Sequence, residues 1–64
     1  MMTAEQKRKA LDEVIARMAE AEDVAEVKRL DDKGYEYARG SNDRKDALRA
    51  AKQAAISRIQ AVAQ

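Results

Sequence analysis

The chain contains no cysteine, histidine or proline, no phenylalanine or tryptophan, and only two glycines in 64 residues. No disulfide can form without cysteine, and without cysteine or histidine the usual zinc ligands are missing. The lack of cysteine fits a reducing compartment, so we expect a cytoplasmic protein. No apolar run approaches the ~20 residues that span a bilayer, and the charged N-terminus has no apolar segment of a signal peptide behind it. We therefore expect no membrane partner.

The absence of histidine and cysteine also argues against catalysis. Thr3, Ser41, Ser57 and two tyrosines are the only hydroxyl groups, and no histidine or cysteine accompanies them to act as base or nucleophile. The acidic clusters at 20–23 and 31–32 lack the spacing of an EF-hand, and neither glycine belongs to a glycine-rich phosphate loop. We expect a protein that is not an enzyme, with no cofactor, no metal ion and no small-molecule substrate.

Length and composition predict one small domain, residues 1–64, with a thin core. Hydrophobic residues make up 45% of the chain, but fourteen of these 29 residues are alanine, and the only aromatic residues are two tyrosines. A buried alanine stabilises a fold far less than the roughly 1.5 to 3 kcal/mol of a buried leucine or isoleucine. Chains this small often need burial from elsewhere. We expect association with itself, as a ring or another homo-oligomer, or with other protein subunits.

The net charge of +1 conceals an asymmetry along the chain. Residues 3–23 have a net charge of −2, residues 24–40 are neutral, and residues 41–64 have a net charge of +3. Such a distribution favours head-to-tail packing of subunits, or weak contact with an anionic partner, over strong binding of nucleic acid.

The first amphipathic segment is a helix with a clear start. Thr3 is the expected N-cap, and Gln6 follows it at the spacing of a capping box. Strong helix formers fill the segment, and no glycine or proline ends it before residue 22 or 23. Its apolar stripe contains Leu11, Val14, Ile15 and Met18.

The stripe breaks phase near residue 23. With Val14 set at zero and 100° per residue, Val24, Val27 and Leu30 fall at about 280°, 220° and 160°, on the far side of a continuous helix. An extended chain from residue 23 onward would let these three residues pack. We therefore expect the helix to end there.

A short β-hairpin is the preferred interpretation of residues 24–39. Residues 24–30 and 35–39 flank a polar turn that contains Gly34, a residue able to take the positive φ of a bulged hairpin loop. Tyr35 and Tyr37 are two positions apart, so both rings would face one side of the second strand and cover the helices.

The second helix begins after Gly40, with a polar cap among residues 41–43, and runs to about residue 63. Its stripe keeps phase through Leu48, Ala51, Ala55, Ile59 and Val62. The predicted fold is thus α+β: a helix, a short antiparallel β-hairpin and a second helix, with the two helices packed antiparallel. The alternative is an all-α helical hairpin. The expected core residues are Leu11, Val14, Ile15, Met18, Val27, Tyr35, Tyr37, Leu48 and Ile59.

One surface feature of the second helix is a candidate interaction site. Lys45, Arg49 and Lys52 are spaced four and three residues apart, so they form a basic ridge on one side of the helix. The ridge could make weak contact with the DNA backbone or meet acidic residues of a neighbouring subunit. The alternative is a solvated flank that only contributes solubility.

Several segments together resemble a known family. Thr-Ala-Glu-Gln at 3–6, the stripe that ends at Met18, and Val-Ala-Glu-Val at 24–27 are similar to the family of the phage lambda head-to-tail joining protein W. Tyr-Glu-Tyr at 35–37 would match the second strand of that family, and Leu48 the first core leucine of its second helix. The resemblance covers residues 3 to about 60.

The resemblance implies a non-enzymatic phage structural protein. It would be a head-completion or head-tail connector subunit that assembles on the portal and provides a tail docking surface, and it would be located in the virion. Two other functions fit a short chain without catalytic residues. One is a homodimeric helical-hairpin regulator that binds RNA or protein, and the other is a small phage-encoded inhibitor of a host protein.

Overall fold

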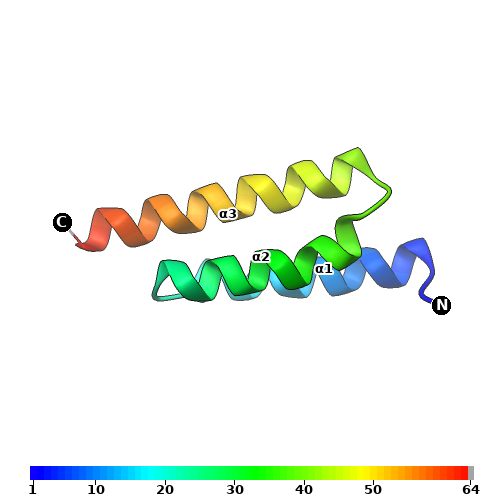
Figure 1. Cartoon of the computed structure of the whole chain (residues 1–64), viewed down its shortest axis with the longest axis horizontal. Helices are drawn as coiled ribbons and strands as arrows, with labels where there is room; N and C mark the ends of the chain where they lie inside the picture. Colours follow the sequence, from blue (N-terminus) through cyan, green and yellow to red (C-terminus); the bar gives the residue numbers. More distant parts are fainter. Residues whose placement is uncertain (64) are drawn as a thin grey trace.

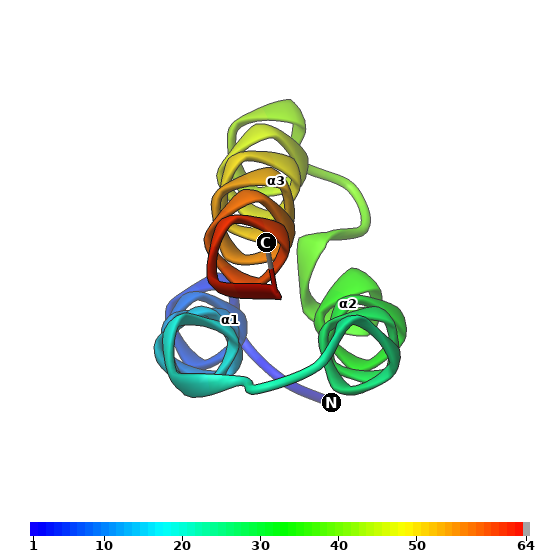
Figure 2. The same cartoon turned by 90° about the vertical axis from the view of Figure 1, so that its left-hand side faces the viewer.

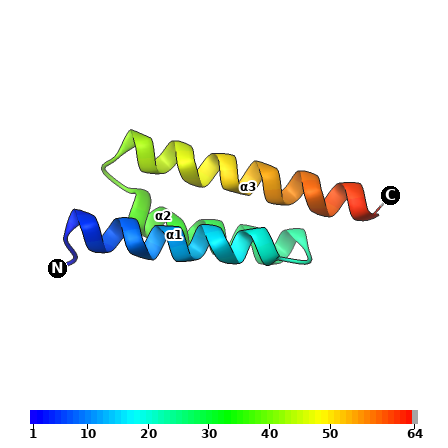
Figure 3. The same cartoon turned by 180° about the vertical axis from the view of Figure 1, so that it is seen from behind.

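The protein is a bundle of three helices. The structure, a computed structural model, describes residues 1–63, and side chains through residue 62. Helix α1 spans Ala4–Glu20, α2 spans Val24–Ala38 and α3 spans Asn42–Ala63. Helix α2 runs antiparallel to both neighbours, so α1 and α3 are parallel (Figures 1 and 3). Figure 2 shows α3 lying on the pair formed by α1 and α2, and the Cα atoms extend over 42 × 17 × 14 Å.

The α+β prediction is wrong, because residues 1–63 contain no strand. Residues 24–30 and 35–38 belong to one helix, α2, and the expected turn at Gly34 lies inside it. The all-α alternative has the right class but only two helices. The antiparallel packing expected for the first and last helices is also wrong, since the additional helix reverses the direction of the chain once more.

The phase break marks a junction between two helices instead of the start of a strand. Ala21 and Asp23 have extended backbones, with ψ of 142° and 161°, and this short irregular segment resets the helical phase. Asp23 then caps α2, because its Oδ1 atom accepts a hydrogen bond of 2.8 Å from the backbone N–H of Glu26. Val27 is consequently fully buried within a helix.

The other two helix starts follow their sequence signals. The capping box at Thr3 is confirmed: its Oγ1 accepts from the N–H of Gln6 at 3.1 Å, and the Gln6 Oε1 accepts from the N–H of Thr3 at 2.9 Å. Ser41 Oγ accepts from the N–H of Arg44 at 3.3 Å at the start of α3. Gly40 precedes this cap with a φ of +85°, which only glycine adopts easily.

Gly34 lies in α2 because the helices approach closely there. A Cβ atom at this position would lie 2.9 Å from Leu48 Cδ1 and 3.1 Å from Val14 Cγ1. A glycine inside a helix costs about 1 kcal/mol relative to alanine. Here it allows α1 and α3 to pack against α2 at the same level, which explains why a turn-forming residue occupies a helix.

The core runs along the axis between the three helices. Its fully or nearly fully buried residues are Leu11, Val14, Met18, Ala21, Val27, Ala38, Leu48 and Ala55. Three other expected core residues, Ile15, Tyr37 and Ile59, are partly buried against it. Tyr35 was expected in the core and is instead 51% exposed. Residues two apart on a helix point about 200° apart, so the two tyrosines cannot cover the same surface.

No helix within residues 1–63 combines the length and the apolar character needed to cross a membrane. Helix α3 is the longest, at 22 residues, but it contains charged side chains in its first three turns and again at Arg58.

Candidate functional site

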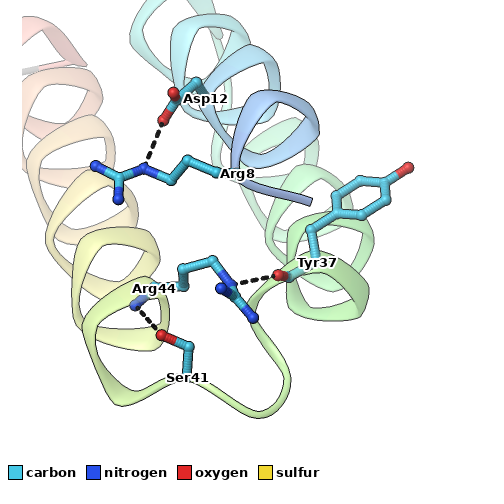
Figure 4. A network of polar contacts seen from close by, with 5 residues as sticks. All are labelled: Arg8, Asp12, Tyr37, Ser41 and Arg44. Carbon is cyan, nitrogen blue, oxygen red and sulfur yellow. Dashed lines mark hydrogen bonds and ion pairs between the residues drawn. The ribbon is translucent and has the colours of Figure 1, made fainter. Parts of the chain in front are cut away.

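Two arginines on α3 set how this helix lies on the other two. Near its start, Arg44 Nε donates a hydrogen bond of 2.9 Å to the Tyr37 carbonyl (Figure 4). Its Nη2 donates to the Arg39 carbonyl at 3.3 Å. Carbonyl groups at helix C-termini have no partner within the helix. Arg44 therefore caps the end of α2 from the neighbouring helix.

Arg58 performs the equivalent role at the other end of α3. Its Nη2 donates to the carbonyls of Met18 and Ala21, at 3.2 and 2.8 Å, where α1 ends. Because α1 and α2 are antiparallel, their C-termini lie at opposite ends of the bundle. One arginine at each end thus fixes α3 against both helices.

The ridge on α3 borders a groove that α2 completes. We name it the α2/α3 groove; its lining residues are Asp31, Tyr35, Lys45, Leu48, Arg49 and Lys52, and its volume is about 180 Å³. All three predicted ridge residues line it. The structure adds Asp31 and Tyr35, which the sequence did not associate with the ridge.

The floor of the α2/α3 groove is apolar and one of its walls is aromatic. Leu48 is 4% exposed and packs against the backbone of α2 at Gly34. Tyr35, next to Gly34 in sequence, is half-exposed, so its ring offers apolar area and its hydroxyl a polar tip. Among the described residues beyond the first two, only Tyr35 and Val62 are large hydrophobic residues with most of their surface in water.

The three basic side chains of the groove are not equivalent. Lys52 Nζ forms an ion pair of 3.2 Å with Asp31 Oδ2, and both side chains are largely covered, with exposed fractions of 35% and 25%. Arg49 faces Asp46 at 3.9 Å, but both of these side chains are about 70% exposed, so water screens the pair. Lys45 has no ion pair within residues 1–63. The groove therefore has a surplus of positive charge at Lys45 and Arg49.

The size of the groove limits what it can hold. Sites for drug-sized ligands usually enclose about 300 to 1,000 Å³, and this groove is smaller and open at the surface. It has room for one or two side chains of a partner. The described residues also contain no group of three or more acidic side chains placed to hold a metal ion.

Comparison of the chain with protein families, curated proteins and solved structures finds no match.

Sequence reasoning missed Arg44, Arg58 and Asp31. The start of α3 contains one signal for Arg44, because a basic residue six positions after the end of α2 can reach back to its carbonyls. Nothing local signals Arg58, whose partner Ala21 is 37 residues away. Asp31 became a partner of Lys52 only because α2 is helical and presents it to α3.

Proposed function

We propose that the protein is a non-enzymatic subunit that binds another protein through the α2/α3 groove. The observation that carries this proposal is that the half-exposed Tyr35 lines the same groove as Arg49 and the buried Leu48. Tyrosine and arginine around an apolar centre are typical of the few residues that provide most of the binding energy at protein interfaces.

The charge of the groove indicates the partner's chemistry. Lys45 and Arg49 are not strongly paired within the described residues, whereas Lys52 is held by Asp31. A segment with an apolar side chain flanked by carboxylates would fill the space over Leu48 and neutralise these two cations. Complementary charge of this kind contributes mainly to specificity and association rate.

A titration followed by ¹⁵N NMR tests the proposal. Two amphipathic peptides with identical apolar positions serve as probes, one with glutamate and one with lysine at every charged position. We expect shifts at Tyr35, Lys45, Leu48 and Arg49 with the acidic peptide only. The variants Tyr35→Ala and Arg49→Glu should each weaken this binding about tenfold. Equal shifts with both peptides, or shifts confined to other surfaces, would contradict the proposal.

The connector role is a narrower form of the same proposal. Its support is the resemblance alone. That support is reduced, because the segments at 24–27 and 35–37, which would match two strands of the family, are parts of one helix, α2. Its test is electron microscopy of isolated portal rings mixed with the protein. An added layer of density on the ring, and location in the virion, would support a connector, and bare rings at saturating protein would exclude it.

The basic ridge of Lys45, Arg49 and Lys52 could also make weak contact with DNA phosphates. Of the three ridge residues, Lys45 and Arg49 are available for phosphates, because Lys52 is engaged with Asp31. Two phosphate contacts give a shallow dependence on salt, with a slope of about −2 in log affinity against log salt. A fluorescence anisotropy titration at several salt concentrations, with the triple variant Lys45→Ala, Arg49→Ala and Lys52→Ala as comparison, measures it. Equal binding by both proteins would exclude the ridge as the DNA contact.

A further inference from the structure

Helix α3 projects beyond the rest of the bundle at one end. Figures 1 and 3 show its last turn extending past the junction between α1 and α2. Arg58 lies at the level of this junction, because it donates to the Ala21 carbonyl. Of the apolar residues that follow, Ile59 is partly buried and Val62 is 81% exposed. We call Ile59 and Val62 the α3 overhang.

The surroundings of the α3 overhang are acidic. Glu22, Arg58, Ile59 and Val62 line one open hollow of about 440 Å³. The junction segment 20–26 contains four exposed carboxylates and no basic residue. Arg58 is the one cation of this hollow, and its guanidinium group already donates to the carbonyls of α1. The end of the molecule that carries the overhang thus combines exposed apolar surface with negative charge.

The α2/α3 groove has the complementary character and lies toward the other end of α3. It is formed by the first half of α3 and the second half of α2, whereas the overhang is the last turn of α3. Its floor and wall, Leu48 and Tyr35, are apolar, and Lys45 and Arg49 give it positive charge. The apolar residues of the groove could therefore pack against those of the α3 overhang, and the positive charge of the groove is complementary to the negative charge around the overhang.

We propose that the α3 overhang of one copy occupies the α2/α3 groove of the next copy, so that the chain associates head to tail. This inference rests on the proposed function, because it names a second copy as the occupant of the same groove. Val62 would lie over Leu48 and Tyr35, with Glu22 and its neighbours facing Lys45 and Arg49. The interface joins two different surfaces, so it is heterologous and each added copy leaves one free groove and one free overhang.

The thin core makes such burial valuable to the fold. Among the described residues, eight hydrophobic residues form the buried core, and three of them are alanines. Covering Val62 and Tyr35 would remove from water the two large hydrophobic side chains that are most exposed after residue 2. Burial of apolar area at roughly 25 cal/mol per Å² favours the associated state.

Two variants that each block one surface test the proposal. Val62→Asp places a charge on the overhang, and the double variant Lys45→Glu, Arg49→Glu reverses the charge of the groove. All three positions are at least partly exposed, so circular dichroism should show unchanged helicity. Matched controls on other faces are Gln60→Asp for the overhang, and the double variant Arg29→Glu, Lys33→Glu for the groove.

The readout is molar mass by sedimentation velocity and by light scattering after gel filtration, over a range of concentration and salt. The wild type and both controls should exceed the monomer mass of 7.2 kDa as concentration rises, and less so at high salt. Each blocked variant alone should stay monomeric. An equal mixture of the two blocked variants should form a dimer of twice that mass and nothing larger, because it contains one intact groove and one intact overhang.

Three outcomes would overturn the head-to-tail proposal: a wild type that is monomeric at millimolar concentration, blocked variants that associate like wild type, or a mixture that stays monomeric. The peptide titration separates this failure from failure of the proposed function. A monomeric wild type that still binds the acidic peptide at Tyr35 and Arg49 refutes self-association only. A monomeric wild type that binds neither peptide refutes both.

Discussion

Arg58 Nη2 lies 2.8 Å from the carbonyl oxygen of Ala21, so the last third of α3 holds the end of α1 from 37 residues away. Helix α1 has no glycine or proline at its C-terminus, and Ala21 leaves the helix with an extended backbone. The only local capping bond at this end is from the Ala21 N–H to the Met18 carbonyl, at 3.2 Å, and within the described residues the arginine adds two more, to the Met18 and Ala21 carbonyls. The two bonds from Arg58 therefore stabilise the end of α1 only when α3 packs beside it.

Arg58→Ala should lower the free energy of unfolding by roughly 1 to 2 kcal/mol. Hydrogen bonds from a charged donor contribute about 1.5 to 3 kcal/mol, and partial access to water reduces that here. Urea denaturation followed by circular dichroism measures the change. Arg29→Ala, at an exposed site of α2 without a hydrogen bond or ion pair from its side chain within residues 1–63, should change stability by less than about 0.5 kcal/mol. Equal effects of the two substitutions would contradict the role of Arg58.

Gly34→Ala should destabilise the protein by about 1 kcal/mol, although alanine favours a helix. The gain in helix propensity is about 1 kcal/mol, and overpacking of a filled core typically costs about 1 to 3 kcal/mol. Val14 is stiff because it is β-branched, and Leu48 is buried, so neither can move freely from the new methyl group.

A second substitution separates steric from backbone effects at Gly34. In a Leu48→Val background the same Gly34→Ala change should cost less, since the side chain that it meets at 2.9 Å is shorter. Thermal and urea denaturation measure the change in the free energy of unfolding caused by Gly34→Ala in each background. Stabilisation of the otherwise wild-type protein by Gly34→Ala would show that α3 lies further from α2 than this contact requires.

The ion pair between Lys52 and Asp31 should have a coupling energy of about 0.5 to 1 kcal/mol in a double-mutant cycle with alanine. It is partly covered and joins two helices, unlike the exposed pair of Arg49 and Asp46, whose coupling should be about 0.3 kcal/mol or less. Raising the salt concentration to about 1 M should weaken both. A coupling for Lys52 and Asp31 no larger than that of the exposed pair would contradict the contact.

The sequence predicted the helices that have local signals at their ends. The capping box at Thr3 and the polar cap after Gly40 locate the starts of α1 and α3, and both are observed. The loss of phase near residue 23 also correctly located a break in the chain. Phase alone cannot distinguish an extended strand from a new helix after the break, because either one repositions Val24 and Val27.

The sequence also contains a capping signal for α2. Asp23 is followed three residues later by Glu26, the spacing of an N-cap with an acidic third residue, and Asp23 does cap the helix. Gly34 is expected in a turn because glycine can take the positive φ of a hairpin loop. Its real role depends on Val14 and Leu48, which lie 20 and 14 residues away in sequence, so no local pattern could reveal it.

The candidate site was predictable in part. The spacing of Lys45, Arg49 and Lys52 placed them on one side of a helix, and all three border the groove. Their differing states were not predictable, because Asp31 reaches Lys52 only through the packing of α2 on α3. The sequence predicts Tyr35 in the core, whereas in the structure it forms the exposed wall of the groove.

The α2/α3 groove exists only if α2 is one continuous helix that packs against α3 at Gly34, and both proposals depend on this groove. Nuclear Overhauser contacts in the labelled protein test this directly. We predict unbroken contacts between Hα of residue i and the amide of residue i+3 across Val24–Ala38, together with contacts from the Gly34 Hα atoms to the Leu48 methyl groups. Cross-strand contacts between residues 25–29 and 35–38, with no contact between Gly34 and Leu48, would contradict it.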